Sequence, residues 1–126
     1  MVYTASHLSL AVLEKLVHVD PDLVPDRLVA FEIELPDQDA SREAVPIDRL
    51  PPDWRAEPPA PSTQYIGRAW LADPTRSAVL VVPSVVVPYE MDYLLNPAHP
   101  EAGRWSVVGT APFRFDPRLL VRRSTR

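Results

Sequence analysis

The chain has 126 residues, of which 46% are hydrophobic and 24% are charged, as in an ordinary globular domain that can bury a core. Its formal net charge of -4 argues against direct nucleic-acid binding, and the absence of cysteine excludes disulfides, thiolate catalysis and zinc–thiolate sites. No apolar run reaches the ~18 residues of a membrane span and the N-terminus lacks the residue order of a signal peptide, so we expect a cytoplasmic protein.

The first third of the chain predicts a strand, a helix and a second strand. Val2 to Thr4 has the character of a strand end, and an apolar helix is expected over residues 7–19. Asp20 and Pro21 end that helix, because proline disfavours helical backbone at the residue before it. Residues 28–35 (LVAFEIEL) alternate apolar and polar side chains from Phe31 onward and predict a strand.

A proline-rich stretch follows at residues 36–61. The chain contains 16 prolines, and they cluster toward the end of this stretch. Proline fixes the backbone and removes a hydrogen-bond donor. We therefore expect a long loop that contains Asp53 and Trp54 and includes a single turn of helix. Residues 63–71 (TQYIGRAWL) then predict a short helix, which Gly67 weakens.

The second half of the chain is dominated by short apolar segments. Residues 78–82 form a β-branched run typical of a buried strand, and residues 85–87 are expected to continue extended. Residues 93–95 are short and end in a turn signal at Asn96 and Pro97. Residues 105–115 predict one or two further strands.

The order of these elements favours an α+β fold, because helices and strands mix without regular βαβ units. We expect a single domain over residues 1–126, in which the 7–19 helix packs on a sheet built from 28–35, 78–87 and 105–115. The basic residues near the C-terminus are expected to belong to a solvated end of the chain; they are Arg118, Arg122, Arg123 and Arg126.

The 7–19 helix also carries a narrow polar stripe. With 100° per residue, Glu14, His7 and His18 fall at about 80°, 100° and 120°, at the shoulder of a wide apolar arc. A carboxylate at this shoulder would be partly desolvated, so that either its pKa is raised or it requires a partner. The alternative is a solvated face with a weak Glu14–His18 pair. A metal site is not expected, because His7 and His18 lie about 16 Å apart along the helix axis.

No common catalytic or nucleotide-binding motif is present. No Ser-His-Asp order stands out, and three glycines cannot build a phosphate-binding loop. The dinucleotide fingerprint of the Rossmann type is also absent. A nucleotide, if one binds, must therefore bind through a different fold.

Segments spread over nearly the whole chain resemble the RES-domain family. Each segment alone is ordinary, but they occur in the family's order and at plausible spacing. They are VYTA (2–5), LSLAVLE (8–14), VH (17–18), TQYIG (63–67), AWL (69–71), VLVVPSVVVP (79–88), YLLNPAHP (93–100) and PFRFDPRL (112–119).

The family is named for an Arg, a Glu and a Ser. Glu14 matches the Glu and Ser84 matches the Ser. The Arg belongs to a Gly-x-Arg-Trp-like segment upstream of the strand that ends at Tyr3, so we expect that the N-terminal segment of the family is missing here. Asp92 stands where the family often has Asn.

The resemblance implies a mixed, split-sheet core similar to that of ADP-ribosyltransferases, with a buried amphipathic helix near the N-terminus. It implies NAD as substrate, rather than as a resident cofactor. The nicotinamide–ribose bond would be cleaved by water or phosphate, or the ADP-ribose would be transferred to a protein. It also implies a helix-turn-helix antitoxin of the Xre type that blocks the pocket, and self-association of the toxin.

The matched residues then acquire expected roles. Glu14 would stabilise the positive charge that develops on the ribose. Tyr3 would stack on the nicotinamide or ribose, unless it is a core aromatic. Ser84 would reach the nicotinamide amide or a phosphate, unless it is a turn serine. Asn96 is a fourth candidate for NAD binding, although a turn role suits it better. We expect Tyr3, Glu14 and Ser84 to face one cleft.

The missing Arg would have held the NAD diphosphate, because guanidinium binds phosphate bidentately. We therefore expect little or no NAD-cleaving activity from the 126 residues as they stand, unless an arginine within them substitutes. The alternative is an interaction domain of the same fold without catalytic activity. A miscalled start would produce the same sequence, and an in-frame Gly-x-Arg-Trp in the upstream DNA would reveal it.

Overall fold

The computed structural model describes residues 1–37 and 41–121, which form two separate β-sheets. The larger sheet has four strands in the order β1-β5-β4-β3, and the smaller is an antiparallel pair of β2 and β6. Within the larger sheet β3 runs parallel to β4, and the other pairs are antiparallel. The strands are β1 (Val2–Ala5), β2 (Leu28–Glu34), β3 (Arg42–Ala44), β4 (Val79–Pro83), β5 (Met91–Leu95) and β6 (Ser106–Phe113).

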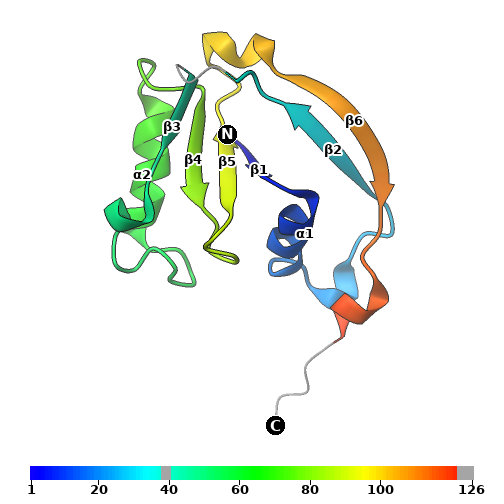
Figure 1. The fold of residues 1–126 in the computed structure, drawn as a ribbon. Coiled ribbons are helices and arrows are strands. Elements are labelled where there is room, and N and C mark those ends of the chain that lie inside the picture. Colours follow the sequence, from blue (N-terminus) through cyan, green and yellow to red (C-terminus); the bar gives the residue numbers. More distant parts are fainter. Residues whose placement is uncertain (38–40, 122–126) are drawn as a thin grey trace.

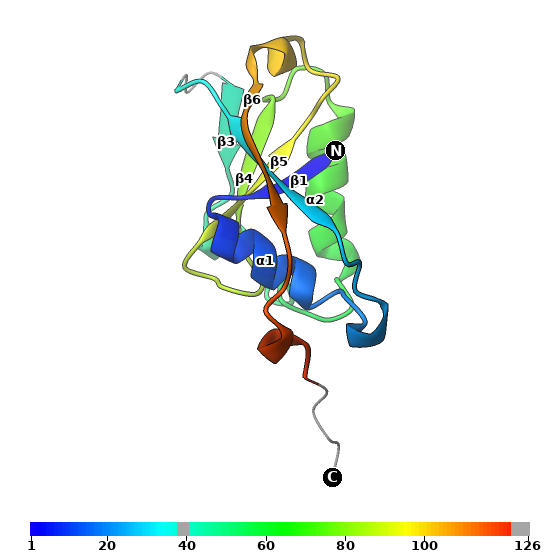
Figure 2. The same ribbon diagram turned by 90° about the vertical axis from the view of Figure 1, so that its right-hand side faces the viewer.

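The described residues also contain two α-helices, α1 (Leu8–Leu16) and α2 (Pro61–Ala72). Figure 1 shows α2 along one side of the four-stranded sheet and the β2–β6 ribbon on the other side, with α1 following directly after β1. The turned view in Figure 2 shows the ribbon crossing in front of the sheet. No helix among the described residues is long and apolar enough to cross a membrane.

The core lies on both faces of the four-stranded sheet. Alternate side chains of a strand point to opposite faces, so Leu80 packs with Trp70 of α2 on one face. Val79 packs on the other face, where the end of the ribbon and Trp105 cover it. Burial on both faces explains why β4 is apolar at every position, as the sequence predicts for residues 78–82.

The expected α+β class and the split core are confirmed, as are strands within 28–35 and 105–115 and a helix at 63–71. The expectation of one sheet from 28–35, 78–87 and 105–115 is wrong, because β2 and β6 pair only with each other. The hydrophobic pattern identifies the strands, but the choice of partner is made by contacts between residues far apart in sequence.

Three predicted boundaries also change. The helix expected over residues 7–19 ends at Leu16, and of its nine described residues only Leu10 is fully buried. The predicted extended run at residues 85–87 is instead part of a turn. The predicted loop at 36–61 contains β3, whose three residues are too few to show an alternating pattern. Residues 38–40 of that loop, and Arg122, Arg123 and Arg126 of the predicted solvated end, lie outside the described residues.

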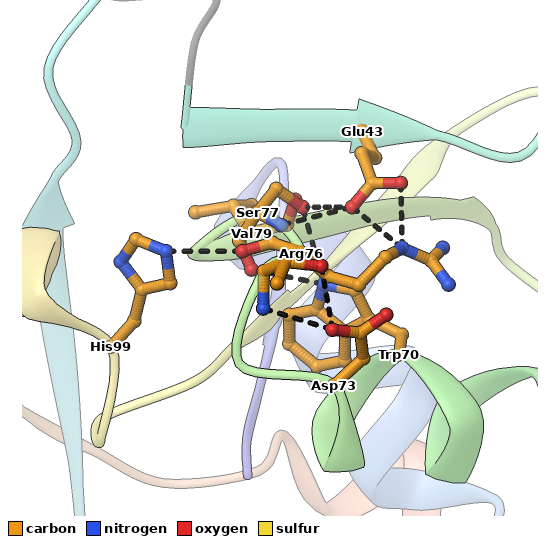
Figure 3. A network of polar contacts seen from close by, with 8 residues as sticks. Glu43, Trp70, Asp73, Arg76, Ser77, Val79 and His99 are labelled. Atoms are coloured by element: carbon orange, nitrogen blue, oxygen red, sulfur yellow. Dashed lines mark hydrogen bonds and ion pairs between the residues drawn. The ribbon is translucent and has the colours of Figure 1, made fainter.

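A polar network attaches β3 and α2 to the start of β4 (Figure 3). The Glu43 carboxylate accepts hydrogen bonds from the backbone N–H of Ser77 at 2.9 Å and from Nε of Arg76 at 2.9 Å. The indole N–H of Trp70 donates to the backbone oxygen of Ser77 at 3.0 Å. The ring of His99 lies 3.1 Å from the backbone oxygen of Arg76. The network therefore fixes the edge strand and the C-terminal end of α2 relative to β4.

The charge of Glu43 is stabilised by this network. Burial alone would raise the pKa of Glu43, but the hydrogen bonds from Ser77 and Arg76 and the charge of Arg76 together lower it below the usual value. A lowered pKa in the folded state means that the stabilisation is present above the pKa of an unfolded glutamate. It is lost as the pH falls through the folded-state value.

We predict that Glu43→Gln lowers the free energy of unfolding by about 1 kcal/mol at pH 7, a value discounted for the partial exposure of the pair. The difference from wild type should shrink toward pH 3, because both proteins then present a neutral group. Urea denaturation at the two pH values measures this. Glu101→Gln is the matched control, since Glu101 forms an exposed pair with Arg104. A similar loss in the control, or no change in Glu43→Gln, would contradict the proposed role of the network.

Candidate functional site

The strand register gathers one set of side chains on the α2 face of the four-stranded sheet. Leu94 of β5 lies opposite both Tyr3 of β1 and Leu80 of β4, and Asp92 lies opposite Val82. Residues directly opposite each other in an antiparallel pair point to the same face. Tyr3 and Asp92 are therefore the polar side chains that these strands bring to an otherwise apolar surface.

A cavity of about 850 Å³ opens over this face. Its walls come from α1, α2, the loop around residues 50–59 and the strands β1, β4 and β5. A volume of this size lies in the range typical of small-molecule sites. The polar and aromatic residues of the wall include Tyr3, Glu14, Lys15, His18, Trp54 and Arg68.

Glu14 of α1 is held against the sheet by Ser84. The Ser84 hydroxyl donates to Oε1 of Glu14 at 2.6 Å, across 70 residues of sequence. Ser84 is fully buried, and its Oγ accepts the backbone N–H groups of Val86 and Val87 at 3.1 and 3.0 Å. Because two N–H groups occupy the lone pairs of Oγ, the hydroxyl hydrogen is left to point at Glu14. Glu14, half-buried, presents its carboxylate at the cavity wall.

Ser84 occupies this position because of the loop between β4 and β5. Pro83 ends β4, and the backbone N–H of Ser84 donates to the backbone oxygen of Glu90 at 2.9 Å, which closes the loop. The chain then turns through Val86 and Val87 over the serine side chain. This local turn is the reason that residues 85–87 do not extend β4.

Asp92 lies behind the cavity wall, next to Tyr3 and Glu14. The Tyr3 hydroxyl donates to Oδ2 of Asp92 at 2.8 Å, and Asp92 is fully buried. Burial raises the pKa of Asp92 to about 7, with the contact and the charge of Glu14 adding to this effect and the Tyr3 hydrogen bond opposing it. Burial and the hydrogen bond to Asp92 also raise the pKa of Tyr3, so the phenol stays protonated and remains a donor.

The other polar candidates lie elsewhere or act differently. Asn96 accepts the backbone N–H of Ala98 at 3.0 Å and lines a smaller hollow of about 370 Å³, so the structure does not bring it together with Tyr3, Glu14 and Ser84. His7 is exposed, with Nδ1 3.4 Å from Glu90, whereas His18 lines the large cavity. Among residues 1–37 and 41–121, no group of three or more His, Cys, Asp or Glu side chains could hold a metal ion.

Sequence reasoning did not identify Asp92 or Lys15 as parts of the site, and Arg68 was only one of several arginines that could replace the missing Arg. Asp92 drew notice only as a departure from the family pattern, although its place beside Leu94 in an apolar strand is itself unusual for a carboxylate. Lys15 follows Glu14 on α1, and Arg68 lies within α2. Both residues line the cavity. No local motif marks either cation.

Comparisons with known proteins show the family of the chain. A sequence model of the RES domain matches residues 1–116. The chain is 40% identical over 121 residues to the "Prs ADP-ribosylating toxin" of Sphingobium sp. (strain YBL2), covering 95% of this chain and 74% of that protein. It is 38% identical over 120 residues to a "Toxin Res" of Photorhabdus laumondii, covering 94% and 75%. A "Toxin Res" of Yersinia enterocolitica is 38% identical over 119 residues, with coverage of 94% and 76%. The chain belongs to the RES-domain family.

Proposed function

We propose that this protein is a RES-type toxin that cleaves NAD⁺ at the nicotinamide–ribose bond and passes the ADP-ribose to an acceptor. The observation that carries the proposal is the Glu14 carboxylate, held by buried Ser84 at the wall of the cavity. The name of the Sphingobium relative, an ADP-ribosylating toxin, supports the same chemistry. NAD⁺ is the substrate in this proposal, and no resident cofactor takes part.

Glu14 would act on the ribose of the bound substrate. When the bond to nicotinamide breaks, its electron pair leaves with the nicotinamide and the ribose becomes positively charged. A fixed carboxylate beside that ribose stabilises the charge without having to reorganise. The acceptor, which is water, phosphate or a protein side chain, then forms the new bond to the ribose and releases its proton.

Ser84 would serve this reaction as a positioning residue. Its side chain is fully buried, and its hydroxyl hydrogen is donated to Glu14 in the structure. A donor aimed at the carboxylate favours the ionised form and fixes its direction. The earlier expectation, a direct contact with the nicotinamide amide or a phosphate, remains the competing role.

Substrate binding would use the cations and the aromatic ring of the cavity wall. Arg68 and Lys15 offer positive charge for the diphosphate, and the Tyr3 ring lines the cavity while its hydroxyl is held by Asp92. Among the described residues no carboxylate forms an ion pair with Arg68, so its guanidinium is available to a phosphate. Arg68 is thus the best candidate for a diphosphate ligand among residues 1–37 and 41–121.

The family resemblance also implies a partner protein, self-association and a cellular compartment. A helix-turn-helix antitoxin of the Xre type would cover the cavity mouth, the toxin would self-associate, and both proteins would work in the cytoplasm. Co-expression with the neighbouring reading frame and co-purification test this part. A neighbour without a DNA-binding motif and without binding would remove it and leave the proposed chemistry intact.

Glu14→Gln should lower the rate of NAD⁺ cleavage by at least about 100-fold, because the neutral amide cannot stabilise the developing positive charge. The amide oxygen still accepts from Ser84, so folding should be preserved. Release of nicotinamide by the purified full-length protein is the measurement. Glu57→Gln is the matched control, since Glu57 also lines the cavity. Rates within threefold of wild type for Glu14→Gln would contradict the proposal. No cleavage by the wild type would favour the non-catalytic interaction domain.

Ser84→Ala distinguishes the positioning role from direct substrate contact. If Ser84 positions Glu14, kcat should fall about 10- to 100-fold with little change in KM; a contact to bound NAD⁺ would instead raise KM. The variant also leaves two partly buried N–H groups without their acceptor, which should cost about 1 kcal/mol of stability. Circular dichroism at the assay temperature therefore accompanies the kinetics, to show that the measured protein is folded.

Arg68→Gln should raise KM for NAD⁺ by roughly 10- to 150-fold. The variant loses a charge-assisted contact of about 1.5–3 kcal/mol, and about 1.4 kcal/mol corresponds to a tenfold change in affinity. The matched control is Arg49→Gln, because Arg49 is exposed and absent from the cavity wall. An unchanged KM in Arg68→Gln would show that the diphosphate is held by another group.

A further inference from the structure

Asp92 is the buried carboxyl group of the site that the proposed reaction does not use. Its Oδ2 accepts the Tyr3 hydroxyl, but its buried Oδ1 has no hydrogen-bond partner among the described residues. Glu14 is its neighbouring carboxyl group, and it acts on Asp92 strongly enough to raise the pKa of that carboxyl. Two carboxylate oxygens cannot bond to each other unless one of them carries a proton. The unpartnered oxygen and the neighbouring carboxylate therefore point to a missing hydrogen.

We infer that Asp92 is a neutral carboxylic acid in the working protein and that its proton, carried on Oδ1, is donated to Glu14. Asp92 then receives one hydrogen bond, from Tyr3, and gives one, to Glu14. It becomes a second positioning residue for the Glu14 carboxylate, alongside Ser84. This inference deepens the proposed function and rests on it where activity is concerned.

The alternatives are less favourable. If both groups were ionised, two like charges would be neighbours with one of them fully buried, which strongly disfavours one ionised form. If Glu14 carried the proton instead, the fully buried group would hold the charge and the half-exposed one would be neutral. The Ser84 hydroxyl, which donates to Glu14, also favours the charge on Glu14. The proton therefore belongs on Asp92.

The surroundings of Asp92 contain few groups that could alter this assignment. Glu14 faces it from α1 and Tyr3 from β1, and the pKa of Asp92 responds to these two groups and to burial. On β4 the residue opposite Asp92 is Val82, which is uncharged. Three further groups line the adjacent cavity: Lys15 on α1, His18 just after the end of α1, and Arg68 on α2. The balance of these effects raises the pKa of Asp92 to about 7.

A proton on Asp92 would make the stability and activity of the protein depend on pH in a defined direction. The folded protein releases this proton around pH 7, where half of the Asp92 groups are ionised, whereas an unfolded aspartate releases it near pH 3.9. The stabilisation contributed by the neutral acid is thus fully present below about pH 3.9, declines between the two values, and is gone above about pH 7. Loss of the proton also removes a donor to Glu14 and adds a like charge beside it.

Asp92→Asn tests the inference because an amide has the same shape and the same pattern, with one oxygen to accept from Tyr3 and one N–H group to donate to Glu14. In the full-length protein, the heat-unfolding midpoint of wild type should fall more steeply between pH 4.5 and 7.5 than that of Asp92→Asn. NAD⁺ cleavage by wild type should decline by up to tenfold per pH unit above pH 7, and the variant should keep its activity there. Asp116→Asn, a change to an exposed aspartate, is the control and should leave both profiles as in wild type.

A measurement on the unmodified protein guards against a variant that fails to fold. The carbon resonance of the Asp92 carboxyl, followed by NMR in protein labelled at aspartate, should titrate near pH 7. Titration near pH 4, or an Asp92→Asn variant whose stability profile parallels that of wild type, would overturn the inference. If the stability and NMR results hold but no form of the protein cleaves NAD⁺, the proposed function fails while the protonated Asp92 stands.

Discussion

The candidate site depends on the three hydrogen bonds of one buried hydroxyl group. Ser84 Oγ receives the N–H groups of Val86 and Val87 and gives its hydrogen to Glu14. The first two bonds fix the serine within the β4–β5 loop, and the third fixes α1 to that loop. Without it, the carboxylate at the cavity wall would lose the donor that ties it to the β4–β5 loop. Ser84, which local sequence alone would describe as a turn serine, therefore ties the candidate catalytic carboxylate of Glu14 to the end of the sheet.

The same site shows how polar groups are accommodated on an apolar sheet face. Asp92 and Ser84 are fully buried, and burying such groups without partners would be costly. Each is paired with a group of the cavity wall, Asp92 with Tyr3 and Ser84 with Glu14. The buried residues Asp92 and Ser84 therefore hold Tyr3 and Glu14, which line the cavity.

The sequence could predict those parts of the fold that local patterns determine. The apolar run of β4 and the helix of α2 were predicted because burial and turn signals act within a few residues. The pairing of β2 with β6 was not, because it joins segments about 80 residues apart along the chain through long-range contacts. Glu14 could be singled out from its helical phase, whereas Ser84 and Tyr3 required the family resemblance. The burial of Asp92 could not be foreseen, since it is created by α1 and β1 together.

The sparse packing of α1 has a consequence for the order in which the molecule comes apart. Leu10 is the only fully buried residue of α1, and Leu8 at its start and Val17 just after its end are each 58% exposed. The helix therefore buries little apolar surface compared with the core of the four-stranded sheet. Opening α1 away from the sheet, next to which it lies in Figure 2, therefore costs less free energy than global unfolding. Such local opening would dismantle the cavity wall while the sheet stayed intact. Any molecule that fills the cavity, whether substrate or protein, would slow amide hydrogen exchange in α1 before it affected the strands.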